Sequence, residues 1–169
     1  LAQQLSQLMS RRERDRLRAP VLQSTGAATL ALHEQLLAVL PFQLTAAQRR
    51  VGDEIAADLA RPVPMHRLLQ GDVGSGKTVV AALAATLCID AGWQCALMAP
   101  TEILAEQHFR KLIGWLEPLL EPRGLKVAWL FGGQKKKERD AMLALVESGQ
   151  AALVVGTHAI IQERVVFKN

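Results

Sequence analysis

Residues 68–78, Leu-Leu-Gln-Gly-Asp-Val-Gly-Ser-Gly-Lys-Thr, decide how the rest of the sequence is interpreted. They fit the pattern G-x-x-x-x-G-K-[ST]. Glycines let the loop turn sharply and bring backbone N–H groups against phosphate oxygens. The lysine suits the β- and γ-phosphates of a nucleotide, and the hydroxyl suits a Mg²⁺ ion. The predicted nucleotide site consists of Gly71, Asp72, Val73, Gly74, Ser75, Gly76, Lys77 and Thr78, with Lys77 and Thr78 as the catalytic residues and Thr78 as the Mg²⁺ ligand.

The surroundings of this loop favour a phosphate site over a plain turn between a strand and a helix. Residues 66–70 are predicted to form a short strand before the loop. Residues 78–91 are predicted to form a helix that is apolar nearly all round, as expected for a helix buried against a sheet. Strand, loop and helix therefore follow one another in the order that the phosphate site requires.

The composition is that of a globular protein with a basic balance. Half of the 169 residues are hydrophobic, and the formal net charge is +4 at pH 7. The sequence has no long uncharged run that would span a membrane and no signal-peptide pattern. Cys88 and Cys95 lack metal-ligand spacing and are interpreted as reduced core residues, so we expect a cytoplasmic protein. The clustered positive charge favours a polyanionic partner.

The N-terminal segment is strongly basic. Residues 1–19 are predicted to form a helix that carries five arginines. It is either a solvated helix leading from an upstream domain or a basic arm along a nucleic-acid backbone, and the two interpretations are compatible. After a break at 20–29 and a short helix at 30–40, we expect a helical linker (1–41) to give way to a domain over 42–169. Because the chain begins without methionine, we expect an excerpt of a longer protein.

A helix predicted from about residue 45 to residue 60 begins with Thr45-Ala-Ala-Gln48. As structure, this is a capping box, in which the threonine hydroxyl and the glutamine side chain satisfy backbone N–H groups. As function, a glutamine at this place upstream of a phosphate loop would read the edge of an adenine. The residues alone leave both interpretations open.

The rest of the chain alternates apolar runs with helical patterns. Strands are predicted at 94–99, 125–130 and 151–155, and helices follow the first two, ending near residues 120 and 148. This alternation predicts an α/β fold with an open parallel sheet, helices on both faces and right-handed crossovers. Ligands of such sheets bind at the carboxyl ends of the strands. Four loops should open at that edge, namely 71–78, 100–101, 132–133 and 156–158.

Three segments in this order resemble the RecG family of superfamily 2 DNA helicases. They are the phosphate loop, Met-Ala-Pro-Thr-Glu-Ile-Leu-Ala-Glu-Gln-His at 98–108 and Val-Gly-Thr-His-Ala at 155–159. The resemblance runs from about Phe42 to the end and implies an incomplete RecA-like P-loop NTPase lobe. It further implies ATP and Mg²⁺ as cofactors, and a monomeric, nucleoid-associated parent that remodels branched DNA in repair and recombination. The transcription-repair coupling factor has a similar loop and is the near alternative.

The resemblance also implies roles for individual residues. Phe42 and Gln48 resemble an adenine-reading motif, although the aromatic residue lies closer to the glutamine than in DEAD-box proteins. The implied DNA-binding residues are Pro100, Thr101, Gly132, Gly133, Lys135, Thr157 and His158. Residues 135–139 carry a charge run that is either a solvated helix face or a set of phosphate contacts. His108 and His158 are either plain hydrogen-bonding residues or DNA contacts.

The sequence lacks one part of an ATP-hydrolysing site. Such a site needs an aspartate for Mg²⁺ and a glutamate that orients water, which this family carries as Asp-Glu-x-His. No such run occurs, and we expect the chain to stop before it, so that the fragment alone does not hydrolyse ATP. Two other classes remain: a small-molecule phosphotransferase, for which no lid or acceptor site is evident, and a non-catalytic nucleotide-dependent module that binds nucleic acid.

Overall fold

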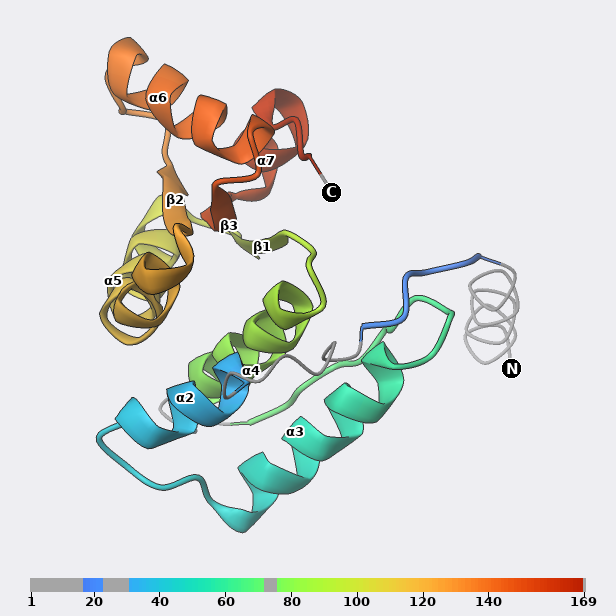
Figure 1. Cartoon of the computed structure of the whole chain (residues 1–169). Coiled ribbons are helices and arrows are strands. Elements are labelled where there is room, and N and C mark those ends of the chain that lie inside the picture. The colour runs from blue at the N-terminus through green and yellow to red at the C-terminus, as the bar shows by residue number, and fades with distance from the viewer. Residues whose placement is uncertain (1–16, 23–30, 72–75, 169) are drawn as a thin grey trace, which may run out of the picture.

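The computed structural model describes residues 17–22, 31–71 and 76–168 (Figure 1). Most of the predicted basic helix, residues 1–16, and the centre of the phosphate loop, residues 72–75, lie outside the described residues; residues 17–22 are irregular. The helices are α2 (Leu32–Val39), α3 (Ala46–Leu59), α4 (Lys77–Asp90), α5 (Glu102–Leu120), the 3₁₀ helix η1 (Glu121–Arg123), α6 (Lys136–Glu147) and α7 (His158–Arg164). The strands are β1 (Cys95–Ala99), β2 (Lys126–Leu130) and β3 (Ala151–Thr157).

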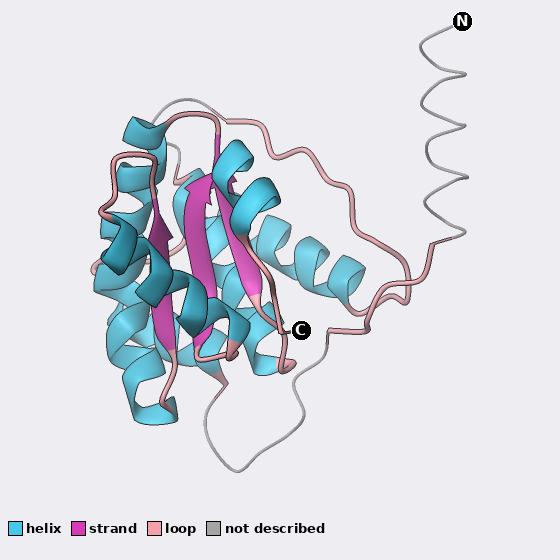
Figure 2. Cartoon of the chain, turned by 90° about the horizontal axis from the view of Figure 1, so that it is seen from above, coloured by secondary structure: helices cyan, strands magenta, loops and turns pink. Residues whose placement is uncertain are grey.

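The three strands form a parallel sheet in the order β1-β3-β2, which confirms the predicted fold class. The central strand β3 is buried from Ala151 to Gly156, because both of its faces are covered. Alternate residues serve the two faces: Leu153 and Val155 join a cluster with α2, α4 and α5, whereas Val154 joins one with α6 and α7. Figure 2 shows helices on both sides of the strands.

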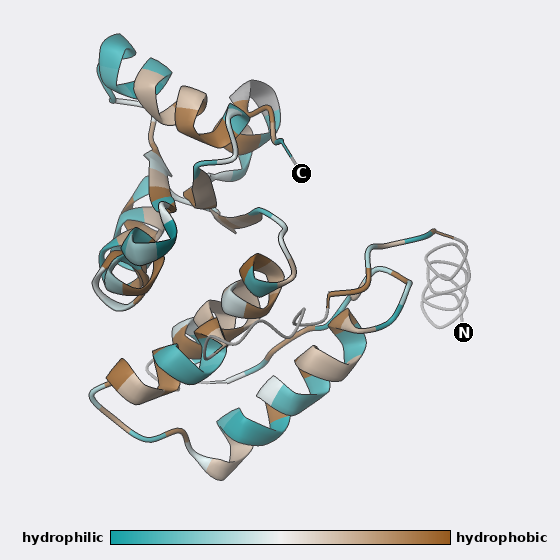
Figure 3. Cartoon of the chain, viewed as in Figure 1, coloured by the Kyte–Doolittle hydropathy of each residue, from teal (hydrophilic) through white to brown (hydrophobic). Residues whose placement is uncertain are grey.

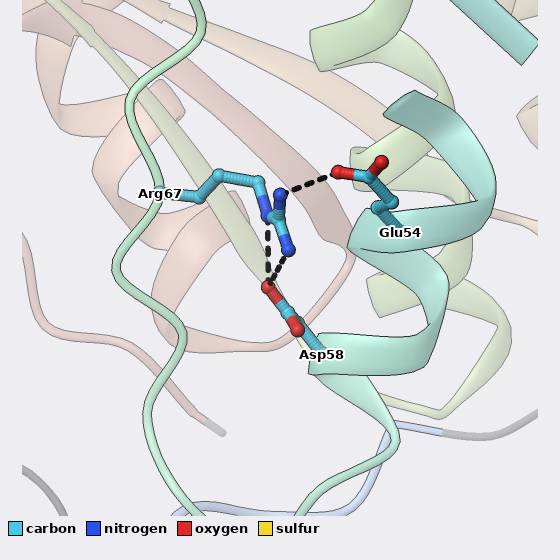
Figure 4. Close-up of polar contacts among 3 residues, drawn as sticks. All are labelled: Glu54, Asp58 and Arg67. Atoms are coloured by element: carbon cyan, nitrogen blue, oxygen red, sulfur yellow. Dashed lines mark hydrogen bonds and ion pairs between the residues drawn. The ribbon is translucent and has the colours of Figure 1, made fainter. Parts of the chain in front are cut away.

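The predicted strand at residues 66–70 is wrong, because these residues are irregular. In the part of the chain that the structure describes, no strand pairs with them, and Leu68 is 79% exposed. Side chains hold the segment instead. Arg67 forms ion pairs of 2.6 Å with Glu54 and 2.7 Å with Asp58, which lie one turn apart on α3 (Figure 4). Leu69 packs against the apolar cluster between α3 and α4.

Helix α2 belongs to the main core although it falls within the predicted linker. Leu32 and Leu36 are fully buried in the same cluster as residues of α4 and α5. The Leu32 N–H donates to Asp90 Oδ2 at 2.8 Å, and Arg123 pairs with Asp90 Oδ1 at 3.0 Å. Among the described residues, therefore, the stretch before residue 41 has no core of its own.

The prediction of a loop at 156–158 is also wrong, because these residues belong to a strand and a helix. Strand β3 continues through Gly156 and Thr157, and α7 begins directly at His158. Gly156 fits tightly, because a Cβ there would lie 2.9 Å from the carbonyl oxygen of Leu130 on β2. Thr157 is both the last residue of β3 and the N-cap of α7, so the strand passes straight into the helix without turn residues.

The surface is of mixed polarity, and several large hydrophobic side chains, such as Leu68 and Ile103, are exposed. The beginning of α6 is hydrophilic, whereas the strands are hydrophobic (Figure 3). None of the described helices is long and apolar enough to cross a lipid bilayer. Cys88 and Cys95 are both half-buried free thiols.

Candidate functional site

The phosphate loop delivers its last glycine to the start of α4. Gly76 is the N-cap of α4 and has φ 80°, a left-handed conformation that disfavours any side chain. The Lys77 ammonium group folds back and donates to the Gly71 carbonyl at 2.7 Å. The hydrogen bond between Lys77 and Gly71 thus connects the two ends of the loop, and it uses the ammonium group that was predicted to contact phosphates. Four predicted site residues, Asp72, Val73, Gly74 and Ser75, lie outside the described residues.

A cavity of about 220 Å³ lies beside this lysine. Gly71, Gly76 and Lys77 line it from the loop, and Gln48 and Val51 line it from α3. The glycines and the ammonium group are suited to phosphate oxygens, and the start of α4 adds the partial positive charge of a helix N-terminus. The cavity and its donors therefore fit a nucleotide phosphate group.

Gln48 makes the predicted capping box. The Thr45 N–H donates to Gln48 Oε1 at 2.9 Å, and the Gln48 N–H donates to Thr45 Oγ1 at 3.1 Å. Its amide nitrogen Nε2 also donates to the Gly76 carbonyl at 3.5 Å. The structural interpretation of Gln48 is confirmed, and the same side chain touches the phosphate loop.

Phe42 lies in a second cavity, of about 560 Å³, that it shares with Gln48. Its ring is 44% exposed and packs edge-on against Trp115, with 6.3 Å between the ring centroids. The other lining residues are His33, Leu37, Gln43, Leu44, Arg49, Gly52, Asp53, Ala56, Leu83 and Leu87. Gln48 borders both this cavity and the phosphate cavity. The structure thus brings Phe42 and Gln48 together; their contact with adenine stays a prediction.

Thr78, the predicted Mg²⁺ ligand, lies in the first turn of α4 and faces α5. Its hydroxyl oxygen is 3.4 Å from His108 Nδ1. Partial burial, together with the nearby Lys111, lowers the pKa of His108. Within the described ranges, no group of three or more His, Cys, Asp or Glu residues is placed to hold a metal. The role of Thr78 as a Mg²⁺ ligand stays a prediction.

The predicted DNA-binding residues gather at one edge of the sheet. The register pairs Ala99 with Thr157, and Leu130 with Gly156, so the residues that follow β1, β2 and β3 emerge side by side. These residues are Pro100 and Thr101 after β1, Gly132, Gly133 and Lys135 after β2, and Thr157 and His158 at the end of β3. The phosphate loop leads into α4, whose buried residues pack in the cluster beneath β3.

Thr101 and His158 both mark helix starts. Thr101 is the N-cap of α5, and its hydroxyl accepts from the Leu104 N–H at 3.3 Å. His158 is the exposed first residue of α7. His108, by contrast, faces Thr78 of α4 at 3.4 Å. Of the two histidines, only His158 lies at the edge predicted for DNA.

The charge run of 135–139 divides into two parts. Lys135, Lys136 and Lys137 are exposed and available to an anionic partner. Arg139 turns back instead, and its Nη2 donates to the carbonyls of Gly132 at 2.8 Å and of Phe131 at 3.3 Å. The phosphate-contact interpretation therefore does not extend to Arg139.

Sequence reasoning missed two residues at this edge. The first is Glu102, which was not predicted although it is the residue after Thr101. Its side chain accepts a hydrogen bond from the Gly132 N–H at 2.6 Å. The second is Arg139, which the sequence places in one charge run with the lysines. Residue type and spacing do not reveal which positive side chain turns toward a nearby backbone carbonyl. A glycine doublet that ends a strand, followed within seven residues by an arginine, was the available signal.

Comparison with known proteins agrees with the motifs and the fold. Residues 45–169 match the family described as DEAD/DEAH box helicase. The chain is 53% identical over 169 residues to the ATP-dependent DNA helicase RecG of Escherichia coli O157:H7, covering 100% of this chain and 23% of the relative. It is 47% identical over 145 residues to the RecG of Mycobacterium bovis, covering 82% of this chain and 20% of the relative.

A solved structure extends the likeness to three dimensions. "Structure of RecG bound to three-way DNA junction" has a TM-score of 0.81 and 42% identity to this chain, covering 95% of this chain and 21% of that one. These matches confirm the resemblance to RecG and the RecA-like helicase fold. The chain belongs to the DEAD/DEAH box helicase family, and over its whole length it is similar to about a quarter of a RecG helicase.

Proposed function

We propose that this chain forms the nucleotide-binding part of an ATP-dependent DNA helicase that remodels branched DNA. The observation that carries the proposal is the match of 95% of the chain, at 42% identity, to a RecG structure with a bound three-way junction. The chain spans about a quarter of the RecG proteins that it matches, so the activity of the whole protein is part of the proposal. That activity is fork reversal and junction migration in DNA repair and recombination, in the bacterial cytoplasm at the nucleoid.

The nucleotide half of the function rests on the loop and α4. Lys77 holds the Gly71 carbonyl at 2.7 Å, and in the proposed complex its ammonium group exchanges this contact for the β- and γ-phosphates of ATP. Thr78 is the proposed Mg²⁺ ligand. Phe42 and Gln48 are the proposed adenine contacts, because both line the 560 Å³ cavity and Gln48 also borders the loop.

The DNA half of the function rests on the strand ends. Parallel register brings residues 100–101, 132–133 and 157–158 to one edge. Helix starts and exposed lysines are suited to phosphate oxygens, which position a protein on DNA without reading sequence. Lys135 begins the exposed lysine run beside the glycine loop and is the proposed electrostatic contact. Residues 42–169 are the proposed nucleotide-binding domain, and residues 1–41 the proposed linker.

The proposed role of this chain is binding rather than hydrolysis. The sequence contains no Asp-Glu-x-His run, and Glu54 and Asp58 of α3 are engaged by Arg67. Without a carboxylate that orients the attacking water, phosphoryl transfer to water lacks an essential part of the site. We expect the catalytic carboxylates to lie elsewhere in the parent protein.

Calorimetric titration with ADP and Mg²⁺ tests the nucleotide half. The chain should bind ADP, and Lys77→Ala should weaken binding at least tenfold, about 1.4 kcal/mol. Lys126→Ala, which removes an exposed lysine at the amino end of β2, away from the cavity, is the matched control and should bind as the unchanged chain does. Equal affinity of Lys77→Ala and the unchanged chain would reject the phosphate site. Rapid DNA-stimulated ATP hydrolysis by the isolated chain would reject the binding-only role.

A further inference from the structure

The loop after β2 is held from both sides by side chains. On the carbonyl side, Arg139 Nη2 donates to Gly132 O at 2.8 Å and to Phe131 O and Gln134 O at 3.3 Å each. Gln134 is 6% exposed, and its amide donates to the Trp129 carbonyl at 3.1 Å. A single guanidinium group therefore gathers three carbonyl groups of the loop into one fixed shape.

The position of Arg139 sets it apart from the lysines on the same helix. Its Nε is buried and has no hydrogen-bond partner among the described residues, and its Nη2 is committed to backbone carbonyls. Lys135 and Lys137 are exposed. A DNA phosphate would meet the lysines at the surface, whereas Arg139 lies on the protein side of the loop.

On the amide side, Glu102 holds the same loop. Its Oε1 accepts from the Gly132 N–H at 2.6 Å, and a Cβ on Gly132 would lie 2.6 Å from that oxygen. Glu102 is the first residue of α5, next to the N-cap Thr101. The contact therefore joins the end of β1 to the end of β2, two of the three places proposed to meet DNA.

We propose that Arg139 and Glu102 are positioning residues for DNA: they hold loop 131–134 against the start of α5, so that Thr101, Gly133 and Lys135 present one preformed surface to a phosphate backbone. The inference rests on the proposed function, since it concerns the DNA edge of the same sheet. A positioning residue acts without touching a phosphate, so its removal lowers affinity without changing the number of counterions that binding releases. Preformed geometry avoids the ordering cost that a loose loop incurs on association.

The salt dependence of DNA binding separates positioning from direct contact. Fluorescence anisotropy measures the affinity of the full 169-residue chain for a labelled three-way junction at several salt concentrations, comparing Arg139→Met with Lys135→Met. Lys135→Met should flatten the plot of log K against log salt by about 0.9. Arg139→Met should weaken binding roughly tenfold, the scale of one charge-assisted hydrogen bond, with an unchanged slope. Flattening by Arg139→Met, or unchanged affinity, overturns the proposal.

Glu102 supplies a second test, in which charge alone and positioning predict opposite changes in DNA affinity. Removal of a carboxylate beside DNA should strengthen binding if only charge matters. Positioning predicts the opposite for Glu102→Ala, a several-fold loss, and predicts that Glu102→Gln, which keeps an acceptor for the Gly132 N–H, binds at least as tightly as the unchanged chain. Tighter binding by Glu102→Ala overturns the proposal. This variant changes an exposed residue, so the test stands even where Arg139→Met does not fold.

Hydrogen exchange without DNA makes the inference testable apart from the proposed function. The amides of residues 132–134 should exchange faster in Arg139→Met and Glu102→Ala than in Lys135→Met, while α4 and the affinity for ADP stay unchanged. If the unchanged chain binds no junction, the proposed function fails, yet faster exchange still supports the loop-holding role. Equal exchange in all three variants rejects that role.

Discussion

Gly76 leads from the phosphate loop into α4, and its carbonyl accepts a hydrogen bond from Gln48 of α3, so its replacement by alanine gives a sharp test of the nucleotide site. Gly76 has φ 80°, and a Cβ built there overlaps Gln48 Nε2. Gly76→Ala therefore both strains the backbone and displaces the side chain that caps α3. Gly92→Ala is the matched control, because Gly92 has φ 85° but a Cβ there meets nothing within 4 Å.

The expected magnitudes follow from these two effects. Left-handed backbone costs an alanine about 1–2 kcal/mol, so both variants should lose about that much stability. Displacement of Gln48 disrupts the capping box on the Thr45 side, which adds about 1 kcal/mol for Gly76→Ala only. In a Gln48→Ala background the cap is already weakened, so the extra cost of Gly76→Ala should disappear. Gly76→Ala should also abolish ADP binding, whereas Gly92→Ala should not.

Urea unfolding followed by circular dichroism measures the stabilities, and calorimetric titration measures the ADP affinities. Two results would refute the reasoning. The first is that Gly76→Ala costs no more stability than Gly92→Ala, which would mean that Gln48 yields without loss. The second is that Gly76→Ala keeps full ADP affinity, which would remove the tight turn from the phosphate site.

Two further predictions concern the sheet and His108. Gly156→Ala should lower stability by about 1–3 kcal/mol, because its Cβ would lie 2.9 Å from the Leu130 carbonyl oxygen. Gly114→Ala should stabilise α5, because nothing lies within 4 Å of the new Cβ. Thermal unfolding of both variants checks these two expectations. Burial and Lys111 lower the pKa of His108, so the unfolded chain takes up a proton there more readily than the folded chain, and stability should fall with pH once pH drops below the ordinary histidine pKa of about 6.5. The loss is complete below the lowered folded pKa. Urea unfolding between pH 8 and pH 5, at about unit steps, should show a smaller fall for His108→Asn than for the unchanged chain; equal falls would contradict the role of His108.

Local patterns in the sequence predicted most elements of the fold. The apolar runs at 94–99, 125–130 and 151–155 became three paired strands, and the amphipathic patterns between them became α5 and α6. The run at 66–70, His-Arg-Leu-Leu-Gln, was predicted as a strand from its place before the phosphate loop but is irregular, because a strand also needs a partner for its backbone hydrogen bonds. Pairing depends on other parts of the chain, and no local pattern reports it.

The site was predictable to the level of loops rather than of contacts. Gly71, Lys77 and Thr78 could be named because their types and spacing carry the chemistry of phosphate binding. The direction of individual side chains could not be inferred. Arg139 and Lys135 belong to one charge run, yet the first holds the loop from within and the second lies exposed. Burial and backbone geometry make that distinction, and neither is visible in residue order.

The central claim is that one edge of the sheet meets branched DNA, and the most direct test is junction binding by a charge-reversed chain. Replacing all three of Lys135, Lys136 and Lys137 by glutamate should weaken three-way-junction binding and flatten its salt dependence by up to roughly 2.7, about 0.9 for each phosphate that a lysine no longer neutralises. The unchanged chain should prefer the junction to a linear duplex of equal length. Unchanged junction affinity and salt slope in the charge-reversed chain would contradict the account and leave the lysines as a solvated helix face.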